Sequence, residues 1–296
     1  MSGARHEARW MRVVRYLACL CAAVVPATQA KAIDCSKALA PVEKRICRDA
    51  VLQRADDEMS AAYTKLLRAA KDAEFRAALA RSQKRWLAVR SKGPGAFGYS
   101  AAHGGDRPDE RAILLSMTRD RRDYLSGETP VRALAAQRMI LKNDSGGAFA
   151  GVSASCLLMA PPYGAWNYAC SAAIHRQNGD RVCSSGLVWA SGRTTEYRLV
   201  SQVEGGSVRV TAVCSTGDAP TSGLCSDADD DAATRSRAFW TTDPDPADLF
   251  AVPRAGQAQK YDADLDPREL DRPWFRDCLF DRVFPPPETL RKERRP

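Results

Sequence analysis

Residues 52–70 have the sequence LQRADDEMSAAYTKLLRAA, in which apolar side chains recur every three or four positions. That spacing places them on one face of an α-helix. The members of this stripe are Leu52, Ala55, Met59, Ala62, Tyr63, Leu66 and Ala70. The stretch therefore predicts an amphipathic helix that buries this face against other helices.

Three further helices are predicted around this one. A short helix is expected to begin at Pro41, because the N–H that proline lacks would be unpaired in a first helical turn. Two more apolar stripes follow, separated by glycines between residues 93 and 105. They consist of Phe75, Leu79, Ser82, Trp86 and Val89, and of Leu114, Met117, Arg121, Tyr124 and Leu125. Together these segments predict a small four-helix domain over residues 33–126.

Beyond Pro130 the sequence changes to short apolar or alternating runs rich in glycine, serine, threonine and valine. Residues 177–180 (QNGD) and 204–207 (EGGS) are typical of hairpin turns, so consecutive strands are expected to pair. The expected strands are residues 149–159, 166–174, 181–189, 197–203 and 207–214. The predicted fold class is α+β: a small N-terminal four-helix domain, then a separate antiparallel β-rich, disulfide-containing domain over residues 127–284.

Charge is distributed unevenly along the chain. Residues 33–126 contain 19 Lys and Arg against 13 Asp and Glu, a net charge of +6 (19 − 13). Residues 127–296 contain 20 against 22, a net charge of −2 (20 − 22). The acidic, proline-containing residues 218–248 are expected to form a long loop, and residues 285–296 a disordered basic tail.

Residues 1–32 have the order of a secretory signal peptide. A basic run ends at Arg15, an apolar run follows to Val25, and small residues surround Ala30 and Ala32. Cleavage after Ala32 is preferred to cleavage after Ala30, and the start at Met1 or Met11 stays open. No later run approaches the ~20 apolar residues that span a bilayer. We expect an exported protein, periplasmic or secreted, that does not span the membrane.

Ten cysteines are present, of which Cys19 and Cys21 lie in the signal peptide. An even number of the others, in an exported chain, favours disulfide bonds. Metal ligation usually needs cysteines about two to four residues apart, so no metal site is expected. The remaining eight are Cys35, Cys47, Cys156, Cys170, Cys183, Cys214, Cys225 and Cys278. The last six can pair in many ways, among which the sequence does not choose.

Several short motifs follow one another between residues 35 and 90. They are C-x-x-A, E-x-x-I-C, L-x-x-x-D, a tyrosine seven residues later, and Q-x-x-W-x-x-x-R. Their residues are Cys35, Glu43, Cys47, Leu52, Asp56, Tyr63, Gln83, Trp86 and Arg90. In this order and spacing they resemble the N-terminal domain of the lysozyme inhibitor LprI family, over about residues 33–125. Two further cysteines that family members often carry are missing here.

The resemblance implies a helical binding domain in which Cys35 pairs with Cys47. Such a pair requires residues 35–40 to fold back, since a continuous helix would hold the two cysteines about 18 Å apart. The other motif residues are expected to be mainly structural, with Trp86 packed and Arg90 paired to Asp56. The alternative is that Trp86 and Arg90 form an exposed hot spot for a protein partner.

No pattern in the sequence indicates an active site. His103 lies in a glycine-rich loop and His175 at a strand end near a turn, with no nucleophile or metal ligand placed beside them in sequence. The run Asp262-x-Asp264-x-Asp266 resembles the start of a calcium loop, but Pro267 follows where a glycine is needed. We therefore expect no enzyme, no cofactor and no metal, and an exported protein is not expected to bind nucleic acid.

Two functions are predicted. The resemblance implies a non-enzymatic binding protein that inhibits lysozyme in the periplasm or at the cell surface. The basic charge of residues 33–126 favours the alternative, a cell-envelope structural or interaction module that binds an anionic polymer or an acidic protein.

Overall fold

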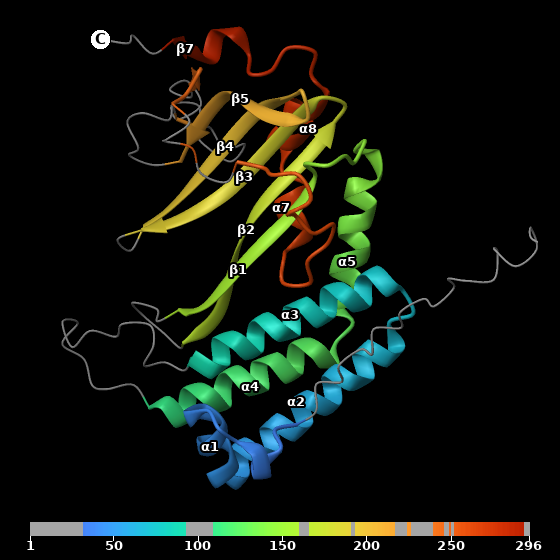
Figure 1. Cartoon of the computed structure of the whole chain (residues 1–296), viewed down its shortest axis with the longest axis vertical. Coiled ribbons are helices and arrows are strands. Elements are labelled where there is room, and N and C mark those ends of the chain that lie inside the picture. The colour runs from blue at the N-terminus through green and yellow to red at the C-terminus, as the bar shows by residue number, and fades with distance from the viewer. Residues whose placement is uncertain are drawn as a thin grey trace, which may run out of the picture. The chain divides into compact units, whose positions relative to one another are not determined.

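Helices occupy the first part of the chain, where the apolar stripes predict them (Figure 1). The computed structural model describes residues 32–92, 109–159, 166–190, 193–216, 224–225, 239–245, 249 and 252–292. Its helices are α1 (Pro41–Arg48), α2 (Ala50–Ala69), α3 (Ala73–Lys92), α4 (Glu110–Ser126), α5 (Thr129–Ile140), α7 (Pro267–Leu270) and α8 (Pro273–Phe280). Short 3-10 turns are η1 (Cys35–Lys37), η4 (Leu141–Asn143) and η6 (Pro287–Thr289).

Aspartate side chains fix where the longer helices begin. Asp49 accepts hydrogen bonds from the N–H groups of Val51 and Leu52 at the start of α2. Asp109 does the same for the start of α4. These bonds satisfy N–H groups that have no partner inside the helix. The predicted stripes are buried, with Leu52, Met59, Trp86, Leu114 and Met117 each at most 2% exposed.

A single sheet forms the second part of the chain. Its strands are β1 (Gly151–Met159), β2 (Asn167–Asn178), β3 (Arg181–Ala190), β4 (Arg193–Glu204), β5 (Ser207–Ser215), β6 (Trp240–Thr242) and β7 (Leu290–Lys292). They lie in chain order, with antiparallel pairing from β1 to β6 and parallel pairing of β7 with β6. The predicted α+β class, with helices first and a disulfide-containing antiparallel sheet after them, is confirmed.

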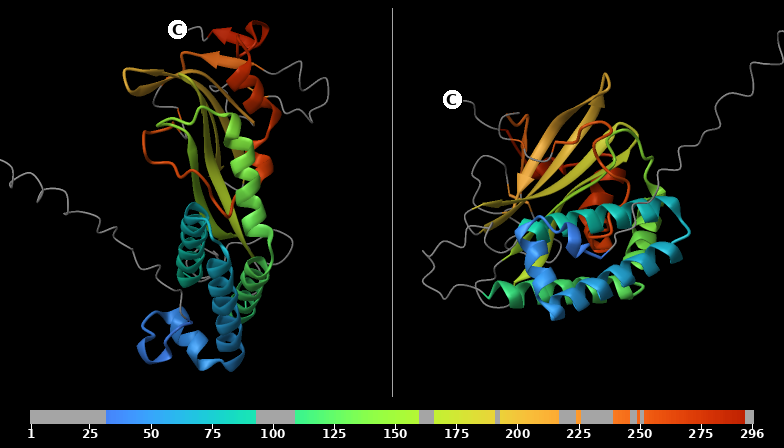
Figure 2. Two further views of the ribbon diagram at one scale, coloured as in Figure 1. Left: turned by 90° about the vertical axis from the view of Figure 1, so that its right-hand side faces the viewer. Right: turned by 60° about the horizontal axis from the view of Figure 1, so that its bottom comes forward.

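Both expected hairpins are present. The turn between β4 and β5 contains Gly205 and Gly206 at φ +57° and +80°, and Glu204 pairs with Ser207. Two consecutive positive φ angles suit the right-handed twist of a hairpin and favour glycine at both positions. One face of the sheet packs against α8, where Phe275 and Cys278 are fully buried beside Val152, Ile174 and Val200 (Figure 2).

Four disulfide bonds join the eight cysteines. Cys35–Cys47 closes the turn before α1, and Cys156–Cys170 joins β1 to β2. Cys183–Cys278 joins β3 to α8, and Cys214–Cys225 lies at the end of β5. The cross-links therefore fix the first turn, the β1–β2 pair and the contact of α8 with the sheet.

Some elements differ from the sequence-based expectation. The chain forms α5 at the start of residues 127–284, which were expected to be β-rich. The sequence did not indicate this helix, because only Pro130, Leu134 and Gln137 are buried on it and its apolar stripe is weak. The predicted disorder from residue 285 is wrong for residues 285–292, which form η6 and pair as β7 with β6. Much of the expected acidic loop at 218–248 lies outside the described residues, as do residues 1–31, but β6 falls within that loop.

Contacts group Lys31–Pro296 into one unit. Within it α3 contacts β1 of the sheet, and α5 contacts α7, which follows the sheet in the chain. Separate folding of residues 33–126 and 127–284 stays a prediction. Among the described residues, no helix has the length and apolar character needed to cross a membrane.

Removing the Cys183–Cys278 bond by Cys183→Ala with Cys278→Ala is expected to lower the free energy of unfolding by about 4 to 5 kcal/mol. The bond closes a loop of 95 residues and both cysteines are fully buried. The matched pair Cys156→Ala with Cys170→Ala opens a loop of 14 residues and should cost about 3 kcal/mol. Urea unfolding measures both. A larger loss for the shorter loop would contradict this ranking.

Candidate functional site

The acidic segment Tyr261–Asp266 lies against α3 and α4, far from it in sequence. Arg85 Nη2 donates to Asp262 Oδ1 at 2.6 Å and to Asp264 Oδ2 at 2.7 Å. Arg121 Nη1 donates to Asp264 Oδ1 at 3.2 Å, and Ser82 Oγ donates to the same oxygen at 2.6 Å. Two arginines of the helical part thus share two carboxylates of the β-rich part.

This ionic cluster is removed from water. The side chains of Asp262, Asp264 and Arg121 are 2%, 4% and 4% exposed, and that of Arg85 is 20% exposed. Burial by itself would raise the pKa of Asp264. The Arg121 charge and the hydrogen bonds from Ser82 and Arg85 outweigh it and hold that pKa below its ordinary value. The carboxylate is therefore charged in the folded protein.

Side chains of the helices also form hydrogen bonds to the backbone of the acidic segment and hold it in place. Gln137 of α5 donates to the carbonyl oxygens of Asp262 and Leu265 and accepts from the Asp262 N–H. Tyr124 Oη donates to the Ala263 carbonyl oxygen, and Arg81 Nη2 donates to that of Tyr261 at 3.0 Å. Side chains of α3, α4 and α5 thus satisfy the backbone groups of the acidic segment as well as its carboxylates.

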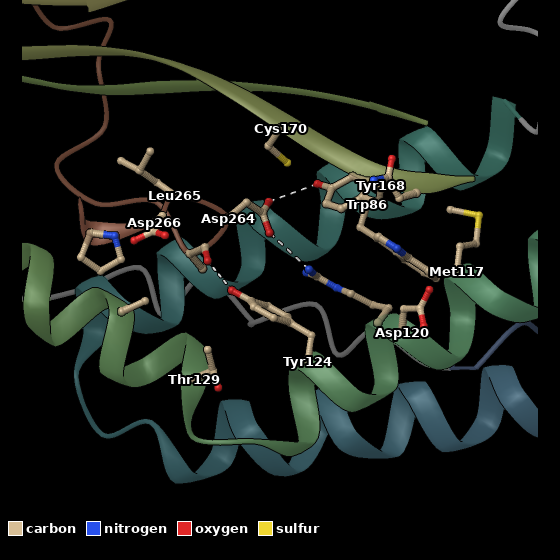
Figure 3. A pocket seen from close by; sticks show the side chains of 15 residues that line it. Trp86, Met117, Asp120, Tyr124, Thr129, Tyr168, Cys170, Asp264, Leu265 and Asp266 are labelled. Carbon is tan, nitrogen blue, oxygen red and sulfur yellow. Dashed lines mark hydrogen bonds and ion pairs between the residues drawn. The ribbon is translucent and has the colours of Figure 1, made fainter. Parts of the chain in front are cut away.

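The sheet adds one contact to the same cluster. Tyr168 of β2 donates its hydroxyl to Asp264 Oδ2 at 3.1 Å, and Figure 3 shows the two side chains meeting. Burial raises the pKa of both Tyr168 and Tyr124, so both hydroxyls are protonated donors. Asp264 is therefore the point at which α3, α4 and β2 meet.

The predicted motif residues lie in the helical part, and two of them, Gln83 and Trp86, contact Arg121 of this cluster. Arg90 is paired to the buried Asp56, and its guanidinium lies 4.8 Å from the Trp86 ring centroid. Gln83 donates to Met59 Sδ and accepts from Arg121 Nε at 3.0 Å. Leu52 and Tyr63 are buried in the helical core, and Glu43 accepts from the N–H groups of Leu39 and Ala40 before α1. The structure places Trp86 and Arg90 in the interior, not on an exposed surface.

A cavity of about 510 Å³ opens beside the cluster. Its wall includes Trp86, Asp120 and Tyr124 from the helices, with Asn167 and Tyr168 from β2 (Figure 3). Asp264 and Asp266 of the acidic segment complete it. The cavity thus exists only where the helical part, the sheet and the acidic segment come together.

His175 lies in the sheet, because β2 continues beyond the expected strand end at Ile174. Its Nδ1 lies 2.9 Å from Ser184 Oγ, and it lines a hollow of about 420 Å³ with Ser153 and Arg254. Burial lowers the pKa of His175 to about 4. Ser184 is fully buried, so this pair offers no accessible nucleophile. His103 lies outside the described residues.

One group of three candidate metal ligands occurs among the described residues: Cys156, Cys170 and Asp264. The two cysteines are joined by a disulfide bond, so they offer no thiolate to a metal ion. The carboxylates of Asp262 and Asp264 accept hydrogen bonds from arginines.

Sequence reasoning missed the pairing at this site, although it noted parts of it. Arg121 stood in an apolar stripe, and a charged residue on a buried face is a signal for an internal partner. The alternation of Tyr261, Ala263 and Leu265 with aspartates was the second signal, and the structure buries the side chains of Asp262 and Asp264 together with these apolar residues. Nothing in the sequence joined the two, because they are more than a hundred residues apart.

Comparison with protein families concerns the helical part. Residues 35–125 match the family model described as "Lysozyme inhibitor LprI". Residues 35–125 are thus similar to this family, and we refer to them below as the LprI-type domain. The resemblance inferred from the motifs is thus confirmed for this segment, and the match does not extend into the sheet. No curated protein and no solved structure is significantly similar to the chain.

The family is one of inhibitors, which agrees with a binding role for the LprI-type domain. Four disulfide bonds fit a location outside the cytoplasm, where thiols are oxidised.

Replacing Asp264 by asparagine is expected to lower the free energy of unfolding by about 3 to 5 kcal/mol, because Arg121 and Arg85 lose a buried counter-charge. Asp266→Asn is the matched control. That carboxylate pairs with an Arg268 side chain that is 89% exposed, so its loss should cost under about 1 kcal/mol. Urea unfolding measures the free energy of unfolding of both variants. Equal losses would show that the buried cluster stabilises the fold no more than an exposed ion pair does.

A pH-dependent loss of stability is expected from His175. Its folded pKa of about 4 lies below the ordinary value of 6.5, so protonation favours the unfolded chain between these values. Stability should fall by about 3 kcal/mol as the pH is lowered from 6.5 to 4. His175→Asn should flatten this part of the profile. An unchanged slope in the variant would show that other groups cause it.

Proposed function

We propose that this protein is an exported, non-enzymatic binding protein that inhibits lysozyme through its LprI-type domain. The observation that carries the proposal is the family match over residues 35–125. The disulfide bonds support export, because they persist in oxidising compartments. The arrangement of Asp56, Trp86 and Arg90 supports a packed domain whose partner binds elsewhere on its surface.

The stapled turn, residues 34–40, is the surface that we propose for this contact. The acidic segment covers polar side chains of α3 and α4, so they do not face a partner. Leu39 in the stapled turn is 81% exposed, although it is a large apolar residue. Its N–H is fixed by Glu43, and the Cys35–Cys47 bond closes the turn. An exposed apolar side chain on a fixed backbone costs little backbone entropy when it binds, which favours a role as an anchor.

Charge sets the salt dependence of this contact. Lysozymes of the c type are basic, and residues 33–126 carry a net charge of +6, so the two repel at long range. Salt screens that repulsion, while contact through Leu39 depends on apolar burial. Binding to lysozyme is therefore expected to hold or strengthen between about 50 and 200 mM salt.

Inhibition is tested with the mature chain, with disulfides intact, titrated into a basic c-type lysozyme while lysis of cell-wall substrate is followed. The wild type should inhibit. Leu39→Asp should raise the concentration for half inhibition at least about tenfold, the equivalent of 1.4 kcal/mol. Met139→Asp is the control, since Met139 is also an exposed apolar residue, at 66%, but lies on α5.

Two results would count against the proposal in different ways. No inhibition by the wild type at any salt would reject the lysozyme function. Inhibition that Leu39→Asp and Met139→Asp reduce equally would reject the stapled turn as the contact and leave the function standing.

The second candidate is a cell-envelope module that binds an anionic polymer or an acidic protein. The net charge of +6 on residues 33–126 favours it. Its salt dependence is opposite, because attraction between unlike charges weakens as salt rises. Retention on an anionic polysaccharide resin that is lost by about 200 mM salt, together with no effect on lysozyme, would support this candidate over the first.

A further inference from the structure

The proton of the His175 ring lies on Nε2. Within the part of the chain that the structure describes, the hydrogen bond between His175 Nδ1 and Ser184 Oγ, at 2.9 Å, is the one that either side chain forms. Ser184 is fully buried, so its hydroxyl hydrogen would stay unpaired unless it is donated to Nδ1. Burial lowers the pKa of His175 to about 4, so the ring is neutral at neutral pH. A neutral ring that accepts at Nδ1 carries its N–H at Nε2.

This N–H is accessible from the hollow of about 420 Å³ on the sheet. His175 lines the hollow and Ser184 does not, so the ring edge opposite Nδ1 faces it. Nε2 has no partner among the described residues. Fully covered side-chain atoms without a partner occur there only in Arg81, Arg85, Ser201 and Trp274. His175 Nε2 is not one of them, so it keeps accessible surface and can donate to a ligand.

The other polar side chains of the hollow also carry donors. Ser153, Arg254 and Gln257 line it, and all three are exposed. The Arg254 guanidinium forms no ion pair and no hydrogen bond with any residue that the structure describes. A guanidinium has five N–H donors and no acceptor. No Asp or Glu is among the described residues of the wall, so this wall carries one positive charge and no negative charge.

The segment that carries Arg254 is held firmly beside β1. The Gly256 N–H donates to the Ala148 carbonyl oxygen at 3.1 Å, and Val152 and Gln259 exchange two backbone hydrogen bonds at 2.6 and 2.8 Å. Gly151 allows this close approach, because a Cβ at its position would lie 2.7 Å from the Ala258 Cβ. The wall is therefore formed before a ligand arrives, which lowers the cost of binding.

The charge of the wall selects the class of ligand. Arg254 would repel a cation, and no described carboxylate of the wall would attract one. A neutral molecule would gain nothing from the unpaired charge. A phosphate group carries about −1.5 to −2 charges at neutral pH, more than one arginine balances. A carboxylate carries a single negative charge, and its two oxygens match the fork of a guanidinium.

We propose that this hollow binds a small molecule through a single carboxylate group. Arg254 pairs with the carboxylate, and His175 Nε2 donates to one of its oxygens. Ala173, Val252 and Ala258 supply an apolar wall for the body of the ligand. The volume lies within the range of roughly 300 to 1,000 Å³ that is usual for small-molecule sites. The site lies on β1, β2 and residues 252–258, so it is independent of the lysozyme contact proposed on the stapled turn.

The test titrates the intact mature protein, labelled with ¹⁵N, with N-acetylalanine and follows the histidine ring signals by NMR. Beyond the signal peptide the chain contains two histidines, His103 and His175, and His175→Gln identifies the signals of the second. We expect the His175 signals to shift progressively and saturably. Long-range correlations between ring protons and nitrogens should place the proton on Nε2 in the free protein.

Three further probes separate charge from shape. N-acetylalanine amide has the same body without the charge, methylammonium is the cation, and inorganic phosphate is the anion of higher charge. The amide and methylammonium are expected to leave the His175 signals in place. Phosphate is expected to bind more weakly than N-acetylalanine.

Arg254→Gln and Arg282→Gln provide the matched pair. Both arginines are exposed, but only Arg254 lines the hollow. Arg254→Gln should weaken binding of N-acetylalanine about tenfold or more, because a hydrogen-bonded ion pair is lost. Arg282→Gln should leave the affinity within about twofold. Because both side chains are exposed, the comparison does not depend on a substitution in the core.

Four results would overturn the proposal. The first is that N-acetylalanine does not shift the His175 signals at millimolar concentration. The second is that the amide, methylammonium or phosphate binds at least as tightly, which would assign the hollow to another class of ligand. The third is that Arg254→Gln and Arg282→Gln change the affinity equally, which would place binding elsewhere. The fourth is a ring proton on Nδ1, which would remove the donor from the hollow.

Discussion

The buried pairing of Asp264 with Arg121 and Arg85 is the interaction on which the rest of this structure depends. A charge without a partner could not be buried at this position, since its desolvation would cost several kcal/mol. Asp264, Arg121 and Arg85 can therefore be buried only together, and the chain must bring residue 264 to α3 and α4. The hydrogen bonds of Gln137, Tyr124 and Tyr168 follow from that placement.

This constraint makes the LprI-type domain part of a larger unit. The family match ends at residue 125, but side chains within it, Ser82, Arg85 and Arg121, find their partners beyond it. The family-motif residues make two kinds of contact in the interior. Asp56 and Arg90 join α2 to α3, and Gln83 accepts a hydrogen bond from Arg121 and so orients it toward Asp264. A segment cut at residue 126 would leave two arginines of a buried site without counter-charges.

Two surfaces with different chemistry result from this arrangement. The stapled turn carries an exposed leucine on a cross-linked backbone, which suits contact with a folded protein. The cavity at the junction is open on one side, and its wall combines apolar side chains with aspartates and tyrosines. Because the first lies before α1 and the second is built from α3, α4 and β2, the two can be altered independently.

The sequence by itself determined the helices α1 to α4, the two hairpins, the even number of cysteines and the LprI resemblance, because each depends on local spacing or on motifs close together in the chain. It pointed to Arg90 and Asp56 as partners, since helical periodicity aligns them. Only the tertiary structure decided how the last six cysteines pair, that residues 285–292 add a strand, and that Asp262 and Asp264 bind Arg85 and Arg121. The Cys183–Cys278 bond, the pairing of β7 with β6 and the aspartate–arginine contacts join residues 50 or more positions apart, and no local pattern encodes which distant charge or thiol will meet another once the core has closed.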